Sequence, residues 1–273
     1  MPELPEVEVL RRTLEPHLCG DRVDAVEVRE PRLRERVSAA LPRRVSGRAI
    51  GRLDRRSKYL LVHLEGDLTM AVHLGMSGRL TLRPPEAPSE PHEHLVFRLS
   101  SGRELRFRDP RRFGLVFVVP TSKLAADRHF RHLGVEPLGS DFDGSWLRGC
   151  ARGRRAPVKS FLMNATVVVG VGNIYACEAL FRAGIHPRRS VARIAEARWE
   201  RLGDAVVAVL EDAITQGGTT LNDFTDGLGE SGYFQVSLEA YGREGRPCPR
   251  CGLLVRKIRQ QGRSTFYCAG CQR

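Results

Sequence analysis

Two pairs of cysteines near the C-terminal end constrain the fold of this chain more than any other feature. Cys248 and Cys251 form one C-x2-C pair, and Cys268 and Cys271 form a second pair after sixteen intervening residues. Four cysteines at this spacing are typical of a structural zinc site, in which protein thiolates fill every coordination position. Two disulfides are the alternative, and a cytosolic chain disfavours them. We therefore predict one structural zinc ion.

The segment between the cysteine pairs predicts a β-hairpin. Residues 253–259 and 264–267 are the expected strands, and residues 260–263 are the expected tip. The hairpin carries four cations, namely Arg256, Lys257, Arg259 and Arg263. Such cations bind phosphates. A solvated basic hairpin without a specific role is the alternative.

The charge of the chain points to a polyanionic partner. Its 273 residues include 44 lysines and arginines against 32 acidic residues, a formal net charge of +12. Nucleic acid and an anionic membrane surface both fit this balance. The longest apolar run, Leu115 to Val119, is far shorter than the roughly 18–20 residues of a membrane-spanning helix. No signal peptide opens the chain, so we expect a cytosolic protein whose remaining cysteines, Cys19, Cys150 and Cys177, are buried thiols.

The N-terminal half predicts one helix followed by many short strands. Apolar residues at spacings of three and four predict a helix from Leu4 to about Leu18. An alternating pattern then predicts strands at 23–28, 58–64, 68–74, 80–82, 94–99, 104–108 and 115–119. Short strands with tight turns are typical of an antiparallel β-sandwich. After about residue 120 the pattern becomes helical, with helices expected at 161–163, 173–182 and 194–214.

The N-terminus itself is a candidate nucleophile. Removal of Met1 would expose the secondary amine of Pro2, and an α-amino group has an ordinary pKa of about 7.7–8.0 against about 10.4 for lysine. A secondary amine that adds to a sugar C1′ gives an iminium, which acidifies the C2′ proton. Glu3 would supply a general acid and Glu6 a second carboxylate. The alternative is an acidic helix start that only complements the helix dipole.

Two turns combine cations with exposed apolar side chains. Residues 108–114 place Phe113 beside Arg111 and Arg112 in a proline-containing turn, and residues 73–78 carry Met76. Arginine beside an aromatic or apolar wedge suits insertion into a base stack. The alternative is that Phe113 and Met76 are ordinary turn or core residues. The glycine-rich turn at 169–172 fits neither nucleotide-loop template, and Asn173 at the next helix start could face a phosphate.

In this order along the chain, these motifs resemble bacterial formamidopyrimidine-DNA glycosylases of the wider family that includes endonuclease VIII. The resemblance is carried by Pro2-Glu3-Leu4-Pro5-Glu6-Val7-Glu8, Arg56-Ser57-Lys58-Tyr59, His73-Leu74-Gly75-Met76-Ser77-Gly78, Asp109-Pro110-Arg111-Arg112-Phe113-Gly114, Val169-Gly170-Val171-Gly172-Asn173-Ile174-Tyr175 and the terminal cysteines. It runs from residue 2 to residue 272.

The resemblance implies a role for each matched residue. Pro2 resembles the Schiff-base nucleophile, Glu3 the acid that assists at the sugar, and Lys58 the lysine of the β-elimination step. Arg263 resembles the fingertip arginine of δ-elimination and phosphate binding. The implied DNA-binding residues are Glu6 near the flipped nucleotide, Met76, Arg111 and Phe113 at the gap left by the extruded base, and His92, Arg155, Lys159 and Asn173 on the DNA backbone.

The resemblance also implies the organisation and the partners. It predicts an α+β chain with a catalytic β-sandwich domain at 1–120, a helix–two-turn–helix domain at 121–235 and a zinc finger at 236–273. The implied activity is excision of oxidised purines such as 8-oxoguanine and formamidopyrimidines, followed by β,δ-elimination at the abasic site. Damaged double-stranded DNA is the expected partner of a monomer without a nucleotide cofactor, in the bacterial cytoplasm with the nucleoid.

Two other functions remain open. An endonuclease VIII-type enzyme would remove oxidised pyrimidines. The sequence of such proteins resembles Gly-Pro at the place where this chain has Val7 after Pro5-Glu6, and residues 217–234 here resemble the purine-lesion loop. A non-catalytic DNA-binding zinc protein would be expected to lose Pro2, Glu3 or Lys58. Two positions depart from the family pattern: Ser57 stands where relatives often carry glycine or alanine, and Asn164 where they often carry an acidic residue.

Overall fold

The computed structural model describes residues 2–218, 227–228 and 238–273. Contacts divide the chain into two compact units. Unit 1 comprises Met1–Arg131 and Gln216–Gln235, and unit 2 comprises His132–Thr215 and Val236–Arg273. Most of the segment that resembles the purine-lesion loop lies outside the described residues.

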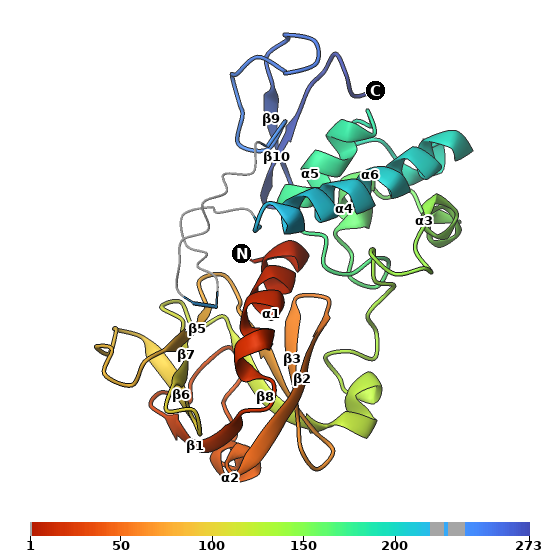
Figure 1. Ribbon diagram of the computed structural model, residues 1–273. Coiled ribbons are helices and arrows are strands. Elements are labelled where there is room, and N and C mark those ends of the chain that lie inside the picture. The colour runs from red at the N-terminus through yellow and green to blue at the C-terminus, as the bar shows by residue number, and fades with distance from the viewer. Residues whose placement is uncertain (1, 219–226, 229–237) are drawn as a thin grey trace. The chain divides into compact units, whose positions relative to one another are not determined.

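Unit 1 begins with helix α1 (Leu4–Leu18), as the apolar spacing predicts. Its predicted face is buried, and α1 packs against strands β2 (Arg48–Arg56) and β3 (Tyr59–Leu64) (Figure 1). Cys19 caps the C-terminal end of α1 and is exposed, so the expectation that it is a buried thiol is wrong. The helix ends at Leu18, so Cys19 lies beyond the buried apolar face of α1. Cys177 is buried, as expected, and Cys150 is half-buried.

The sheet of unit 1 is antiparallel and has the strand order β5-β7-β6-β1-β2-β3-β4-β8. Its strands are β1 (Arg22–Val28), β2 (Arg48–Arg56), β3 (Tyr59–Leu64), β4 (Leu68–His73), β5 (Arg79–Arg83), β6 (Glu93–Leu99), β7 (Glu104–Arg108) and β8 (Leu115–Pro120). Strands β1 and β2 meet at the pairs Arg22–Ala49 and Val23–Arg48. Side chains from both sides of this junction, such as Phe107 of β7 and Val62 of β3, share one buried core. The predicted α+β fold with an antiparallel sandwich is confirmed.

Several elements were not predicted from the sequence. They are β2, the short helix α2 (Leu41–Val45), the 3-10 helices Thr121–Ala126 and Val191–Arg193, and helix α3 (Gly144–Ala151). Asp143 caps α3 by accepting the backbone N–H of Trp146 at 2.6 Å. An aspartate at this position is a common helix start signal.

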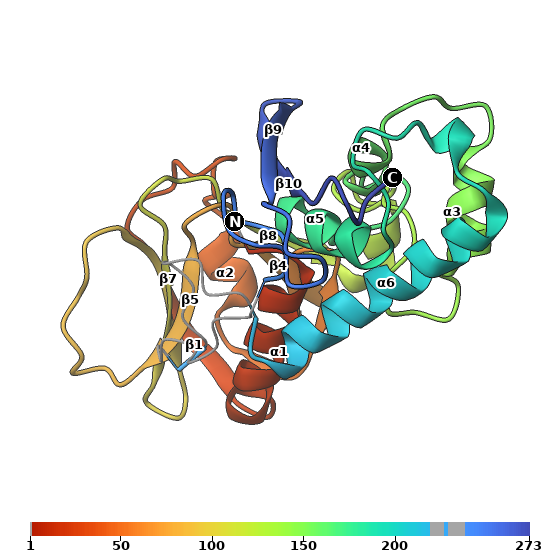
Figure 2. The ribbon, with the colours of Figure 1, turned by 90° about the horizontal axis from the view of Figure 1, so that it is seen from above.

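In its described residues, unit 2 combines four α-helices and a 3-10 helix with a β-hairpin. After α3 come α4 (Val158–Leu162), α5 (Asn173–Arg182), the 3-10 helix Val191–Arg193 and α6 (Glu196–Thr215). Helices α3 and α5 pack against α6, the long helix in Figure 2. Strands β9 (Arg256–Gln260) and β10 (Arg263–Tyr267) form the predicted hairpin, and β10 contacts α5. Within the described residues, no helix is both long and apolar enough to cross a membrane.

Candidate functional site

The start of α1 brings two buried carboxylates beside Pro2. Glu3 and Glu6 are each only 2% exposed, and Pro2 is half-buried. The backbone N–H of Glu3 donates to Oε2 of Glu6 at 2.7 Å, which satisfies one of the free donors of the first helical turn. Gly218, also in unit 1, lies against Glu6, since a Cβ there would stand 3.3 Å from Cγ of Glu6. Two carboxylates shielded from water thus lie at the start of α1, next to Pro2.

A buried ion pair ties α1 to the turn that carries Lys58. Nε of Arg55 lies 3.3 Å from Oε2 of Glu8, and both side chains are at most 10% exposed. The Nη1 group of Arg55 donates to the carbonyl of Ser57 at 3.0 Å. Burial raises the pKa of Glu8, but hydrogen bonds from Arg11 and Arg12 outweigh it and leave this pKa lowered. The carboxylate of Glu8 therefore stays charged and fixes the turn at Ser57.

His73 is a neutral acceptor that supports the turn of Met76. Burial, with a smaller effect from the charge of Lys58, lowers the pKa of His73 to about 4. The backbone N–H of Gly75 donates to Nδ1 of His73 at 2.9 Å. The neutral ring thereby orients the backbone immediately before Met76.

Asp109 joins the two turns that carry the predicted wedge residues, namely Met76, Arg111 and Phe113. It is fully buried, its Oδ1 accepts the hydroxyl of Ser77 at 2.6 Å, and its Oδ2 accepts the N–H of Gly114 at 2.7 Å. The two turns touch through their backbones, because a Cβ on Gly75 would lie 2.4 Å from the carbonyl carbon of Phe113. Turns 73–78 and 109–114 therefore form one rigid body.

The predicted wedge residues project from this body. Met76 is 40% exposed and Phe113 is 43% exposed, unusual values for large apolar side chains in this chain. The guanidinium of Arg111 lies 5.0 Å from the centre of the Phe113 ring, a cation–π geometry. The structure therefore brings Met76, Arg111 and Phe113 together, and they are not core residues.

His92 lies beside the same turns. It is exposed and has a positive φ of 71°, which is uncommon for a residue other than glycine. Its carbonyl accepts the backbone N–H of Asp109 at 3.0 Å. The four residues predicted to contact DNA from unit 1 on this side are thus linked through Asp109.

In unit 2, Lys159 and Asn173 lie inside a hydrogen-bonded cluster. Lys159 is 2% exposed, and its ammonium donates to Oδ1 of Asn173 at 2.5 Å and to Oγ1 of Thr265 at 2.6 Å. Asn173 donates to the carbonyl of Ser264 at 3.0 Å. A buried ammonium needs such partners. The cluster therefore fastens strand β10 to the start of α5, one residue from Arg263.

The other two predicted cations of unit 2 are exposed. Arg155 lies with Arg148, Arg152 and Arg154 around one surface pocket. Arg263 begins β10 directly after a two-residue turn whose residues both have positive φ, 48° at Gln261 and 75° at Gly262. Such a turn suits the twist of a hairpin. Both arginines can therefore reach an anion in solvent.

The four cysteines form the predicted metal site. Their Sγ atoms all lie within 4.8 Å of one another, with 3.8 Å between Cys248 and Cys271 and 3.4 Å between Cys251 and Cys268. Tetrahedral zinc with Zn–S bonds of about 2.3 Å places its sulfurs roughly 3.8 Å apart. Disulfide sulfurs are much closer, at about 2.05 Å. The predicted single structural zinc is confirmed.

The side chains that hold these groups were not predicted from the sequence. Glu8 and Asp109 belong to quoted motifs, but no local signal shows that Glu8 pairs with Arg55 or that Asp109 binds Ser77. Only long-range pairing identifies them. Asn164, which departs from the family pattern, stabilises its own turn, because its Oδ1 accepts the N–H and the hydroxyl of Thr166, each at 3.0 Å.

Comparison with protein-family models gives three matches along the chain. Residues 1–116 match the formamidopyrimidine-DNA glycosylase N-terminal domain, and residues 133–225 match the formamidopyrimidine-DNA glycosylase H2TH domain. Residues 245–273 match a zinc finger found in FPG and IleRS.

Whole-chain comparisons agree with these matches. The chain is 52% identical over 275 residues to a formamidopyrimidine-DNA glycosylase of Acidithiobacillus ferrooxidans and 53% identical over 274 residues to one of Halorhodospira halophila, covering 100% of each chain. It resembles a point mutant of the Lactococcus lactis FPG in complex with a Fapy-dG containing DNA, with a TM-score of 0.93, 34% identity and 99% of each chain covered. It also resembles the MutM (FPG) protein of Thermus thermophilus, with a TM-score of 0.89, 38% identity, and 99% of this chain and 98% of that chain covered.

Proposed function

Because the chain belongs to the formamidopyrimidine-DNA glycosylase family, and is therefore a DNA glycosylase of base excision repair, we propose that Pro2 is its nucleophile. The observation that carries this proposal is the start of α1, where Pro2 adjoins the buried carboxylates of Glu3 and Glu6. The amine nitrogen of Pro2 forms a bond to C1′, and the bond from C1′ to the damaged base breaks. The base leaves with the electron pair and takes up a proton, and the Pro2 nitrogen releases its own N–H proton.

Glu3 and Lys58 then act on the sugar. Glu3 donates a proton to O4′ as the sugar ring opens, and this leaves an iminium between Pro2 and C1′. The iminium acidifies the C2′ proton, and we assign Lys58 to the β-elimination step, in which that proton is lost and the C3′–O bond breaks. The hydrogen bond from Arg55 to the carbonyl of Ser57 supports this role, since it fixes the turn of Lys58 to α1.

Residues of unit 2 serve the second elimination and the DNA backbone. We assign Arg263 to phosphate binding and to the δ-elimination step, in which the C4′ proton is lost and the C5′–O bond breaks. Its exposure at the hairpin turn supports this. Arg155, Lys159 and Asn173 are proposed to act at the DNA backbone, and the burial of Lys159 favours an action through Asn173 and the hairpin.

Base flipping is assigned to the wedge residues. A damaged base cannot present C1′ to a protein amine while it is stacked in the duplex. Met76, Arg111 and Phe113 are proposed to fill the space left by the flipped nucleotide and to contact the base opposite it, with Glu6 near the flipped nucleotide. Their exposure on one rigid body supports this.

Damaged double-stranded DNA is the partner, and the zinc ion is structural. When bound, the zinc joins both ends of the finger and takes no part in the chemistry. We further propose that a single chain is the active unit, that it acts at the bacterial nucleoid, and that the three-domain division at residues 120 and 235 describes its organisation.

The substrate class is tested by measuring base release. Single-turnover excision is compared on matched duplexes that carry 8-oxoguanine opposite cytosine, a formamidopyrimidine or dihydrouracil. We expect both purine lesions to be released faster than dihydrouracil. Faster release of dihydrouracil would instead assign the chain to pyrimidine lesions, and DNA binding without release of any base would contradict the enzymatic role.

A further inference from the structure

The segment from Pro84 to His92 joins β5 to β6, and its backbone depends on hydrogen-bond donors from other parts of unit 1. It is mostly exposed, and four of its nine residues are prolines, namely Pro84, Pro85, Pro88 and Pro91. Proline has no backbone N–H. This segment can therefore be held in place mainly through its carbonyl groups, which need donors from elsewhere in unit 1.

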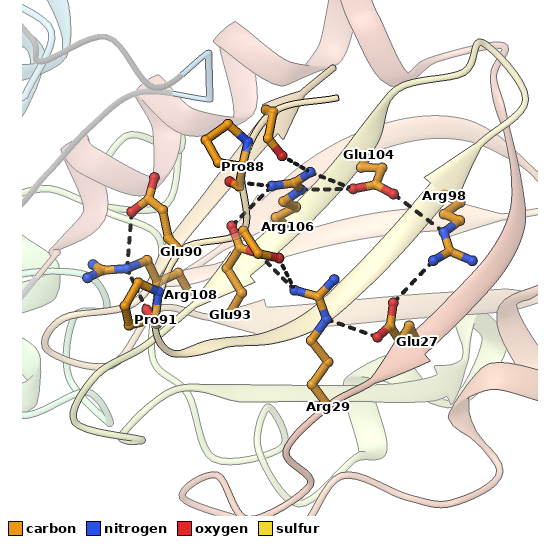
Figure 3. Close-up of polar contacts among 12 residues, drawn as sticks. Glu27, Arg29, Pro88, Glu90, Pro91, Glu93, Arg98, Glu104, Arg106 and Arg108 are labelled. Carbon is orange, nitrogen blue, oxygen red and sulfur yellow. Dashed lines mark hydrogen bonds and ion pairs between the residues drawn. The ribbon is translucent and has the colours of Figure 1, made fainter. Parts of the chain in front are cut away.

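Arg106, in the middle of β7, supplies two of these donors. Its Nη2 group donates to the carbonyl of Ala87 at 2.9 Å, and its Nη1 group donates to the carbonyl of Pro88 at 3.1 Å (Figure 3). The Arg106 side chain is only 4% exposed. A buried guanidinium thus reaches from the sheet to the segment.

Two buried carboxylates neutralise the charge of Arg106. Its Nε group donates to Oε2 of Glu104 at 2.9 Å, and its Nη1 group lies 3.4 Å from Oε1 of Glu93. Glu93 and Glu104 are 8% and 9% exposed. The planar guanidinium has five donors in a fixed fork, and the compact ammonium of lysine cannot reproduce this set of bonds.

Neighbouring arginines hold other parts of the same segment. Arg108 donates to the carbonyl of Pro91 at 2.9 Å, and Arg29 donates to the hydroxyl of Ser89 at 2.8 Å. Arg98 belongs to the same ionic network but is 57% exposed, and its partners are Glu27 and Glu104, which lie outside the segment. Figure 3 shows that Arg106 is the central member and Arg98 a peripheral one.

The segment ends at His92, whose carbonyl is bound by Asp109, the residue that joins the wedge turns. We propose that Arg106 is a positioning residue for DNA binding, which acts through the carbonyls of Ala87 and Pro88 to hold His92 at the DNA backbone. This inference rests on the proposed function, in which His92 is a DNA contact. Arg106 itself touches neither the substrate nor the reacting atoms.

The test compares Arg106→Lys with Arg98→Lys as a matched control. Arg106→Lys keeps a positive charge between Glu93 and Glu104 but loses the fork to the segment. We expect the Kd for a duplex with an abasic-site analogue to rise about five- to tenfold, the effect of one hydrogen bond. The single-turnover rate at saturating enzyme should stay within about twofold of wild type, and Arg98→Lys should leave both values unchanged.

A double-mutant cycle decides whether Arg106 acts through His92. His92→Ala should raise Kd by a similar factor, and the double variant should bind no more weakly than His92→Ala alone. Additive losses, or a lower active fraction in a borohydride titration with an unchanged Kd, would overturn the inference. If His92→Ala leaves Kd unchanged, the DNA contact and this inference both fail, while adduct formation at Pro2 would still uphold the proposed reaction.

Discussion

Ser57 occupies a backbone conformation that side chains with a Cβ rarely adopt. Its φ is 57°, and it lies in the turn that presents Lys58. The left-handed region costs a residue with a Cβ about 1 kcal/mol relative to glycine. Glycine at this position would avoid this cost, whereas alanine, which has a Cβ, would not.

We predict that Ser57→Gly is more stable than Ser57→Ala by about 1 kcal/mol, because both lose the hydroxyl but only glycine relieves the strain. Urea denaturation of the two variants measures the difference. Equal stabilities would show that the turn stores no strain at this position.

His73 gives unit 1 a defined dependence on pH. Burial and then the charge of Lys58 lower its pKa from 6.5 to about 4. Between these values the unfolded chain binds a proton that the folded chain does not, so stability falls as pH falls through this window. The loss from this group alone should be about 2 kcal/mol between pH 7 and pH 5.

The measurement is urea denaturation of wild type and His73→Asn at both pH values. The asparagine amide oxygen can still accept the N–H of Gly75 but does not titrate, so the variant should lose less stability on acidification. His63 and His186 also have lowered pKa values, and their effects cancel in this difference. Equal pH dependence of both proteins would contradict the assignment.

At the scale of elements, the two wedge turns should act as one body. Gly75 has a φ of 65°, and a Cβ there would stand 2.4 Å from the Phe113 carbonyl carbon. Gly75→Ala must therefore push the turns apart. We predict at least about a tenfold loss of excision from duplex DNA, since misplaced catalytic geometry has effects of this size. Cleavage of a single-stranded abasic site should be nearly unchanged, because no base stack has to be filled.

Gly102→Ala is the matched control for this prediction. Gly102 has a φ of 82°, but a Cβ there would meet no atom within 4 Å. It carries the same backbone strain without the clash, so its excision rate should stay near wild type. Equal losses in the two variants would mean that the turns do not act together.

The zinc finger depends on its metal because its apolar core is small. This core contains Phe181 of α5, Ala240, Val255, Phe266 and two of the cysteines. Zinc binding to such a finger contributes about 10 kcal/mol or more at neutral pH. We predict that chelation of the zinc unfolds the hairpin of β9 and β10. It should also raise the Kd for DNA by roughly a hundredfold, since several cations of the finger lose their positions.

Restored zinc should reverse both changes. Cys251→Ser should reproduce the loss, whereas Cys19→Ser, which alters another exposed cysteine, should not. Tight DNA binding by the metal-free protein would contradict a structural role for the zinc in presenting the finger.

Helix α1 and most of the strands are predictable because their apolar residues recur at a regular spacing or form a short continuous run. Strand β1 is among them although its register shifts between Val23 and Ala25, because apolar residues still mark most of its length. Strand β2 has only two buried apolar residues, Ile50 and Leu53, and its register also shifts, between Ile50 and Arg52. A bulge of this kind breaks the alternation on which strand prediction depends. Helix α2 is only five residues long, too short to show a helical period.

At the scale of the whole chain, the net charge of +12 indicates the partner but not the site. Many arginines are used internally, as Arg55 is with Glu8 and Arg106 is with Glu93 and Glu104. The sequence motifs identify the candidate chemical groups, because each motif keeps its residues together. The supporting pairs join residues that are far apart along the chain, so only the fold shows them.

In the proposed reaction, the amine of Pro2 forms the covalent intermediate. Borohydride delivers a hydride to an iminium and converts it into a stable amine. We predict that borohydride traps wild-type protein on a duplex with 8-oxoguanine opposite cytosine, and that peptide mapping places the adduct on Pro2 of chains that lack Met1. An adduct on Lys58 or another lysine, or no adduct from protein that lacks Met1 and binds this DNA, would contradict the account.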